Sequence, residues 1–199
     1  GGAFSGCTDL QKVVIPSTVT NLGSNAFNGC TSLTDAEFNY NTQKGYTLEI
    51  GGGAFYGCSA LENVMLSENV SRIGSETFYG CGALETLILP ESVTYLGSMM
   101  IRGTAVNSIT IPKSVSDCGV NNSGSNYYLG PLAGASYLTT VTIEDGMEKI
   151  PDYLCSSQSL SSYITKIVIP ESVISIADKS FWKCNNMTIY GYKNSYAES

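Results

Sequence analysis

Apolar side chains recur along this chain in a fixed order that repeats every 23 residues. Each repeat reads Leu-x-x-Val-x-Ile, followed by a proline or a polar residue and then by two further apolar positions. Self-similarity with a period of about 20 to 29 residues is typical of a solenoid, in which each repeat forms one coil and buries its apolar face against the next. Three repeats carry the order without interruption, with the apolar sets Leu10, Val13, Ile15, Val19 and Leu22, then Leu61, Val64, Leu66, Val70 and Ile73, and then Leu84, Leu87, Leu89, Val93 and Leu96.

The spacing within one repeat predicts two short extended segments on opposite sides of the coil, and stacked coils would line these segments up as two walls. The segment before Pro16 places alternate side chains on one side, which is the period of a strand, and the proline ends the strand because it has no amide hydrogen to donate. Val19 and Leu22 then form a second inward pair on the opposite wall, and Gly23 marks a turn. Stacking would align the first segments as a parallel sheet with strands about 4.8 Å apart.

A second repeated phrase, Ala-Phe-x-Gly-Cys, joins the end of one repeat to the start of the next. Placed in phase with the walls, its Phe and Cys side chains point inward, so we expect a buried column of each. Tyr56 and Tyr79 both occupy the x position, and we expect them to stack as an outer ladder. The copies and close variants of the phrase span residues 3–7, 26–30, 54–58, 77–81 and 180–184.

Five of the seven cysteines fall in the phase of this phrase. We favour free, buried thiols, with disulfides between neighbouring coils as the alternative, because the strand spacing lies within disulfide reach. Parallel rungs point the same way, which is poor geometry for a disulfide, and an odd number leaves one thiol unpaired. No paired Cys-x-x-Cys occurs, so we expect no zinc site.

The irregular repeats show where insertions are tolerated. The second carries five extra residues within 39–46, the fifth about nine within 120–130, and the seventh four within 155–163. We predict one domain over residues 1–199, a right-handed leucine-rich-repeat solenoid of about eight coils of 23 residues. This fold is α/β by the convention of such repeats but rich in β-structure, with a parallel sheet on the concave side, short second strands and short helical or 3-10 turns. The chain opens in mid-repeat, so we interpret it as a fragment of a longer protein, and residues 184–199 as a C-terminal cap.

These residues resemble the BspA-like, or Treponema-type, leucine-rich repeat family, whose repeat reads approximately Leu-x-x-Val-x-Ile-Pro-x-Ser-Val-Thr-x-Ile-Gly-x-x-Ala-Phe-x-Gly-Cys. The similarity covers nearly the whole chain, and the ending Tyr-Gly-Tyr-Lys-Asn-Ser-Tyr-Ala also looks like that family's usual array ending. The resemblance implies a secreted or cell-surface protein of host-associated bacteria or protozoan parasites. It also implies adhesion to host matrix proteins or to other microbes.

Charge and residue content narrow the function further. A net charge of −7 disfavours nucleic acid and acidic membranes as partners, and no apolar run is long enough to span a bilayer. The chain has no histidine, so the commonest general base and metal ligand is missing. Asp35 with Glu37 could form an acid–base pair, but a solvated strand face explains them better, and a turn explains Glu144 with Asp145. We therefore expect no enzyme, no cofactor and no bound metal.

Outward residues of the first strands should form two parallel columns. An exposed apolar stripe can mark a binding surface, although Val, Ile and Thr also simply suit exposed strands. The first column is Lys12, Asp35, Asn63, Thr86, Ser108, Thr140 and Lys166, and the second, more apolar column is Val14, Glu37, Met65, Ile88, Thr110, Thr142 and Val168.

The insertions at 39–46 and 121–128 are the other candidate surface. They are rich in Tyr, Asn, Ser and Gly, the mixture that recognition loops use, and their tyrosines are Tyr40, Tyr46, Tyr127 and Tyr128. A tolerated loop is the alternative explanation. Together these features favour a noncatalytic extracellular module that binds a protein or a glycan. A structural spacer that displays another domain is the alternative.

Overall fold

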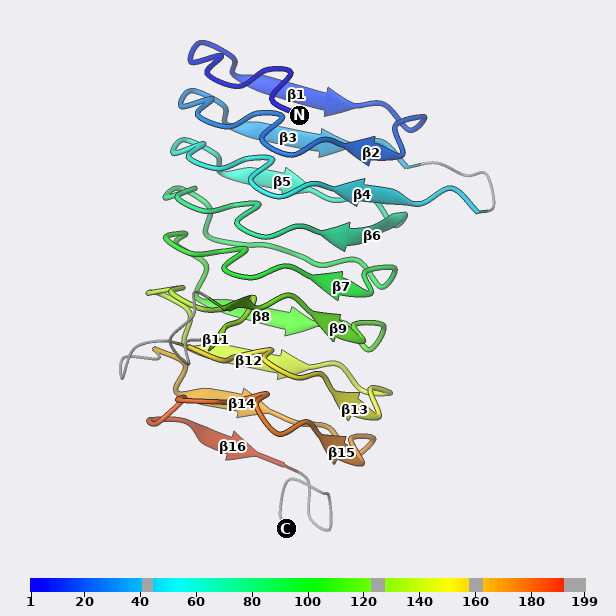
Figure 1. Ribbon diagram of the computed structural model, residues 1–199, viewed down its shortest axis with the longest axis vertical. Coiled ribbons are helices and arrows are strands. Elements are labelled where there is room, and N and C mark those ends of the chain that lie inside the picture. The colour runs from blue at the N-terminus through cyan, green and yellow to red at the C-terminus, as the bar shows by residue number, and fades with distance from the viewer. Residues whose placement is uncertain (41–44, 123–127, 158–162, 192–199) are drawn as a thin grey trace.

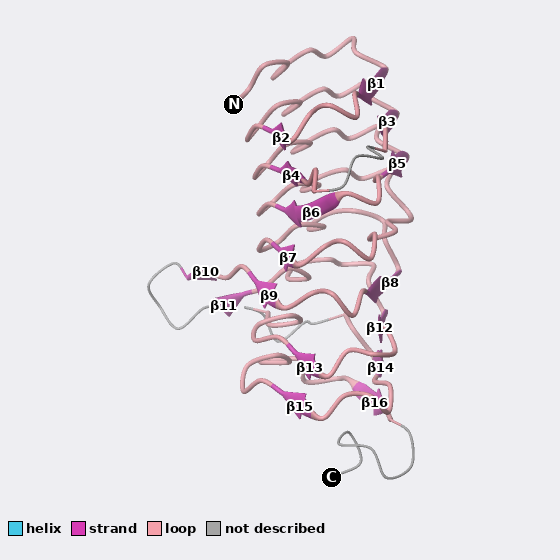
Figure 2. Ribbon diagram, turned by 90° about the vertical axis from the view of Figure 1, so that its right-hand side faces the viewer, coloured by secondary structure: helices cyan, strands magenta, loops and turns pink. Residues whose placement is uncertain are grey.

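The computed structural model describes residues 1–40, 45–122, 128–157 and 163–191. The chain winds as one stack of coils, with the N-terminus at one end of the stack and β16 (Thr188–Tyr190) at the other (Figure 1). Most coils have a strand on one side, which we call the first wall, and all seven have a strand on the other side, the second wall (Figure 2).

The first wall is a parallel sheet in two parts. One part has three strands in the order β1-β3-β5, and the other has four in the order β16-β14-β12-β8. Alternate residues face inward, as the apolar period predicts: Ala36 and Phe38 of β3 are buried between half-exposed Asp35 and Glu37. The strands are β1 (Lys12–Ile15), β3 (Asp35–Phe38), β5 (Asn63–Met65), β8 (Ser108–Ile111), β12 (Thr140–Ile143), β14 (Lys166–Val168) and β16 (Thr188–Tyr190).

The second wall is also parallel, in a five-stranded sheet β2-β4-β6-β7-β9 and a two-stranded sheet β13-β15. Its strands are β2 (Asn21–Leu22), β4 (Leu48–Ile50), β6 (Val70–Ile73), β7 (Tyr95–Leu96), β9 (Asp117–Cys118), β13 (Lys149–Ile150) and β15 (Ser175–Ile176). The described chain therefore forms seven complete coils and β16, the first strand of a further one, where the sequence predicts about eight. We number the coils one to seven from β1, so coil four contains β7.

The large insertion in coil five forms an antiparallel pair, β10 (Asn121–Asn122) with β11 (Tyr128–Leu129). Figure 2 shows this pair projecting from the second-wall side of the stack. The insertion thus leaves the coils on either side of it stacked.

The expected helical or 3-10 turns are a correction, because no helical segment occurs in the residues that the structure describes. The repeated phrase explains this. The amide of Cys30 bonds within its own turn, to the carbonyl of Phe27 at 3.2 Å, whereas the amide of Phe27 bonds to Ala54 of the next coil at 2.7 Å. Because amides alternate between their own turn and the neighbouring coil, successive helical hydrogen bonds do not build up.

Phenylalanine rings form the column that the phrase predicts. The ring centroids of Phe4, Phe27, Phe55 and Phe78 lie 5.1, 5.4 and 5.7 Å apart in succession, with nearly parallel planes. Phe27, Phe55 and Phe78 are fully buried. Phe4 and Cys7 were also expected inside but are exposed, because the first coil has a neighbour on one side only.

The cysteines form the parallel column, and all seven are free thiols, as we favoured. Burial raises the pKa of the Cys58 thiol to about 12, so this side chain is a neutral S–H donor. Cys7 is exposed and Cys184 half-buried, while Cys118 and Cys155 lie inside although they stand outside the phrase. The buried members of the column are part of the packing and offer no reactive thiolate.

Candidate partner-binding surface

The strand register places the two predicted columns on the outer face of the first wall. Lys12 pairs with Asp35 and then Asn63, and Val14 pairs with Glu37 and then Met65. In the second part of the sheet, Ser108, Thr140 and Lys166 continue the first column, and Thr110, Thr142 and Val168 the second.

The columns run one coil further than the sequence predicts. β16 pairs with β14, so Thr188 extends the first column and Tyr190, which is 52% exposed, extends the second. We interpreted this segment as part of a cap. The alternation of Thr188, Ile189 and Tyr190, matching Lys166, Ile167 and Val168, is the signal that identifies it as a strand. Residues 192–199 of that cap lie outside the described residues.

The apolar members of the second column are prominent at one end of the wall. Val14 is 44% exposed, Met65 66% and Ile88 81%. Thr142 and Val168 further along are only half-buried, and Thr110 is exposed. An apolar face of this kind on a sheet is a feature of surfaces that bind a partner.

Two carboxylates on this face, those of Glu37 and Asp35, interact with neighbouring side chains. Oε2 of Glu37 lies 3.1 Å from Nζ of Lys12. Asp35 accepts hydrogen bonds from the hydroxyl of Thr34 at 2.6 Å and the amide of Asn63 at 3.0 Å. These two bonds lower the pKa of Asp35 below its usual value, so the side chain is ionised at neutral pH. An ionised Asp35 is not prepared to donate a proton, which favours the solvated strand face over an acid–base pair.

The first wall is interrupted at coil four. Residues 86–89 pass between β5 and β8 but belong to neither part of the sheet, although Leu87 and Leu89 are buried and Ile88 points outward as predicted. A cavity of about 530 Å³ lies beside this segment. Its lining comes from coils three to six: Glu68, residues 86–91, residues 108–110, Pro112, Thr142 and Glu144.

The rim of this cavity is acidic. Lys113 is placed between two carboxylates, with its Nζ 3.5 Å from Oε2 of Glu91 and 4.0 Å from Oε1 of Glu144. The backbone amide of Lys113 also donates to Glu144 at 2.8 Å, so Glu144 supports the turn after β8. Sequence reasoning assigned Glu144 to a turn but did not find the cavity.

The candidate tyrosines of the insertions have different surroundings. Tyr40 is 56% exposed and Tyr46 46% exposed, at the two ends of the first insertion. Tyr127 lies outside the described residues. Tyr128 is half-buried in a cluster from three coils, which is not the environment of a freely presented anchor.

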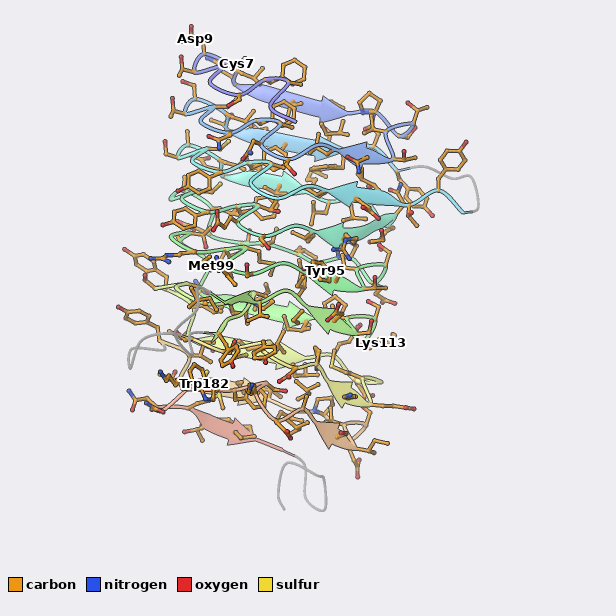
Figure 3. All side chains as sticks on the ribbon, viewed as in Figure 1. Cys7, Asp9, Tyr95, Met99, Lys113 and Trp182 are labelled. Carbon is orange, nitrogen blue, oxygen red and sulfur yellow. The ribbon has the colours of Figure 1, made fainter. Side chains whose placement is uncertain are left out.

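That aromatic cluster consists of Tyr128, Tyr153, Trp182 and Lys179. The Tyr128 ring lies 5.1 Å from Tyr153 and 5.3 Å from Trp182, and Nζ of Lys179 lies 4.2 Å from the Tyr128 ring centroid. Lys179 also donates to the hydroxyl of Tyr153 at 3.2 Å, and this bond raises its pKa. Trp182 and Lys113 lie at opposite sides of the stack in Figure 3, so the cluster and the acidic cavity are separate features.

The outer ladder of tyrosines is confirmed. Tyr56 and Tyr79 stack with ring centroids 4.6 Å apart, and the guanidinium of Arg102, at the same position of the next coil, lies 5.4 Å from the Tyr79 centroid. Trp182 occupies this position too, but Tyr128 and Tyr153 do not, so the repeated phrase does not reveal the aromatic cluster.

Two kinds of site are absent from the described part of the chain. It contains no group of three or more Asp, Glu, Cys or His side chains placed to hold a metal ion. It also has no helix that could span a bilayer.

The repeat pattern matches a known family. The family described as "BspA type Leucine rich repeat region" matches residues 1–129 and 132–188, in six copies. No curated protein matches the chain.

Three solved structures are similar to this chain. A leucine-rich repeat protein of T. pallidum, TpLRR, is 30% identical over 75% of this chain and 63% of its own, with a TM-score of 0.57. The pneumococcal vaccine antigen PcpA is 19% identical over 92% of this chain and 56% of its own, with a TM-score of 0.55. A leucine rich cell surface protein of Faecalibacterium prausnitzii is 20% identical over 95% of this chain and 80% of its own, with a TM-score of 0.39. The chain therefore spans less than two thirds of TpLRR and of PcpA.

Proposed function

Because the chain belongs to the BspA-type leucine-rich repeat family, we propose that it is a noncatalytic recognition module, outside the cell or on its surface, that binds a protein or glycan partner. The binding surface is the outer face of the first wall, and the first insertion, with the exposed Tyr40 and Tyr46, is a second candidate surface. The location is the one that the family resemblance implies.

The apolar part of the second column carries this proposal. It consists of three large apolar side chains that are exposed to solvent, those of Val14, Met65 and Ile88. They share the outer face of the first wall with the exposed strand positions of coil five and of β16. Such a face loses solvent-exposed apolar area when a partner covers it, and this is favourable by roughly 25 cal/mol per Å². The ionised state of Asp35 supports a binding role over acid–base chemistry.

Direct binding tests the proposal. The protein is titrated against immobilised extracellular-matrix proteins and a glycan array, and every partner is retested with the triple variant Val14→Ser, Met65→Ser, Ile88→Ser. We expect at least about a tenfold loss of affinity, because hydrophobic contacts at an interface centre dominate its energy. Ile174→Ser is the matched control, since Ile174 is 69% exposed but lies next to the second wall. A partner that binds the triple variant as well as the original protein argues against this face, and a full-length protein that binds nothing argues against recognition altogether.

A structural spacer is the alternative function. Strands β1 and β16 lie at opposite ends of the stack, so the solenoid would hold domains attached at these two ends apart (Figure 1). Under this alternative, the triple variant leaves cell adhesion unchanged, whereas deletion of whole coils reduces it.

A further inference from the structure

The interruption of the first wall at coil four leaves backbone groups without partners. In the described residues, no amide or carbonyl of Thr86–Leu89 takes part in a backbone hydrogen bond, although the segment lies between two sheets whose strands run parallel to it. The second wall of the same coils is closed, since β7 pairs with both β6 and β9. The opening therefore affects one wall only, and the coils themselves stay stacked.

Unpaired strand groups are a template for another strand. Backbone donors and acceptors that find no partner in the fold are costly unless water or a ligand satisfies them, and an extended peptide satisfies them in a regular series. Residues 86–89 of coil four have the side-chain alternation of a strand, since Leu87 and Leu89 point inward and Ile88 points outward. This segment therefore lacks only the backbone hydrogen bonds to a neighbouring strand.

The cavity beside this segment has the size of a binding site. Its volume of about 530 Å³ falls in the range typical of ligand pockets. Its lining includes apolar side chains, those of Ile88 and Leu89, and the hydroxyl-bearing side chains of Thr110 and Thr142 from the first wall. We call this cavity, together with the backbone of Thr86–Leu89, the coil-four cleft.

The charge at the rim of the coil-four cleft selects the occupant. Three carboxylates line it, Glu68, Glu91 and Glu144, and one ammonium group, that of Lys113, is shared between two of them. Within the described residues, Glu68 takes part in no salt bridge. The surplus of negative charge attracts a cation and repels an acidic chain.

We propose that the coil-four cleft binds an extended, basic polypeptide segment of the partner, which pairs its backbone with Thr86–Leu89, covers Ile88 with an apolar side chain, and places Lys or Arg against Glu68 and Glu91. This proposal rests on the proposed recognition function and names the partner class and the site. Backbone pairing supplies affinity, and the acidic rim supplies selectivity.

Hydrogen–deuterium exchange of the free protein tests the premise. The amides of Thr86–Leu89 should exchange at least about 100-fold faster than those of Val141–Ile143, which lie in the middle strand of the continuous sheet. Equal protection of the two segments would show that coil four is paired, and would overturn the proposal.

A displayed library of random 12-residue peptides then tests the occupant. Peptides enriched on the protein should alternate apolar residues with Lys or Arg, and their synthetic versions should slow exchange at Thr86–Leu89. The double variant Glu68→Gln, Glu91→Gln should weaken them at least about tenfold, as should Ile88→Pro, which removes one amide donor from the cleft. The matched control is Glu148→Gln, Glu171→Gln, two exposed carboxylates outside the cleft, of which Glu171 follows Pro170 as Glu91 follows Pro90.

Each other outcome overturns the proposal in a distinguishable way. Peptides without basic residues, or peptides insensitive to both variants, remove the cleft as their site. Glycan binding that is lost in the variants assigns the cleft to a sugar, and dimers that dissociate on Ile88→Pro assign it to a second copy of this chain. If no peptide is enriched while a matrix protein or glycan still binds the Ile88→Pro protein, the cleft proposal fails and the recognition function stands.

Discussion

The thiol of Cys58 donates a hydrogen bond to the backbone oxygen of Phe27 in the preceding coil, with a sulfur–oxygen distance of 3.1 Å. Cys30 makes the same contact to Phe4 at 3.1 Å, and Cys81 to Phe55 at 3.2 Å. The two columns of the repeated phrase are thus joined, since each sulfhydryl bonds to the backbone of a residue whose ring belongs to the phenylalanine column. Alanine in place of Cys58 would remove the thiol donor, and the carbonyl of Phe27 would keep only the hydrogen bond from the amide of Cys30.

Alkaline pH should destabilise the fold through these thiols. The pKa of Cys58 is raised by burial to about 12 in the folded protein from 9.0, so its stabilising effect is complete below pH 9 and is lost as the pH rises toward 12. Chemical denaturation at pH 8 and pH 10.5 should show a lower midpoint at the higher pH. The drop should be smaller in Cys58→Ala, because one of the thiols that ionise on unfolding is gone; an identical drop in both proteins would contradict the role of Cys58.

Thiol labelling should separate the cysteines by position. At pH 8 an excess of a thiol reagent should modify the exposed Cys7 within minutes, while Cys58 and Cys81 stay unmodified as long as the fold persists. After denaturation without reductant, all seven thiols should react. Mass spectrometry of the labelled peptides measures both, and two missing thiols would reveal a disulfide.

Proline should be tolerated at coil four and not in the continuous sheet. Thr142 lies in β12, between β8 and β14, so Thr142→Pro removes a ladder hydrogen bond and should lower the free energy of unfolding by more than about 2 kcal/mol. Ile88→Pro removes an amide that has no backbone partner among the described residues and should cost less than about 1 kcal/mol. Denaturant midpoints of the two variants decide the matter, and similar losses in both would show that coil four is paired in solution.

The turn before the repeated phrase contains backbone strain that a glycine should relieve. Glu76 has φ of 58°, and Gly53, at the same position one coil earlier, has φ of 63°. A side chain in this left-handed region is unfavourable, so Glu76→Gly should raise the free energy of unfolding by about 0.5–1 kcal/mol. The reverse change, Gly53→Ala, should lower it by at least about 1 kcal/mol. In addition to the strain, its Cβ would lie 2.5 Å from Oδ1 of Asn25. Stabilities that move in the same direction for both changes would refute this assignment.

Tyr128 should matter to stability rather than to binding. Its ring is covered by Tyr153, Trp182 and Lys179, so Tyr128→Ala should cost about 2 kcal/mol, whereas Tyr40→Ala should cost less than about 0.5 kcal/mol. Thermal melts measure the first effect, and the binding assays described above measure any effect on recognition. A Tyr128→Ala protein that melts normally but no longer binds would restore Tyr128 as a contact residue.

The sequence predicts the walls and the columns because they depend on local periods. Val14, Glu37 and Met65 share a face since each occupies the same place in a period of two within a repeat of fixed length. The cysteine and phenylalanine columns follow from the same regular spacing of the repeat. These features need no knowledge of how far apart two coils lie.

The interruption at coil four and the aromatic cluster could not be predicted in this way. The composition of residues 86–89 does not differ from that of a paired strand, so the sequence gives no sign that these residues lack pairing with β5 and β8. Tyr128, Tyr153 and Trp182 come from three separate coils, and Tyr128 reaches the other two through an insertion. Both depend on the relative placement of neighbouring coils, which a repeat period leaves open.

The two walls are interrupted at different levels. The first wall is open between β5 and β8, where β6, β7 and β9 of the second wall are continuous, and the second wall is open between β9 and β13, where β8 and β12 of the first wall are paired. Each interruption in one wall therefore lies opposite a continuous hydrogen-bonded ladder in the other wall. From the first coil to the seventh, no cut across the described stack passes between two coils without breaking a sheet ladder, so a pull along its axis meets resistance at every level.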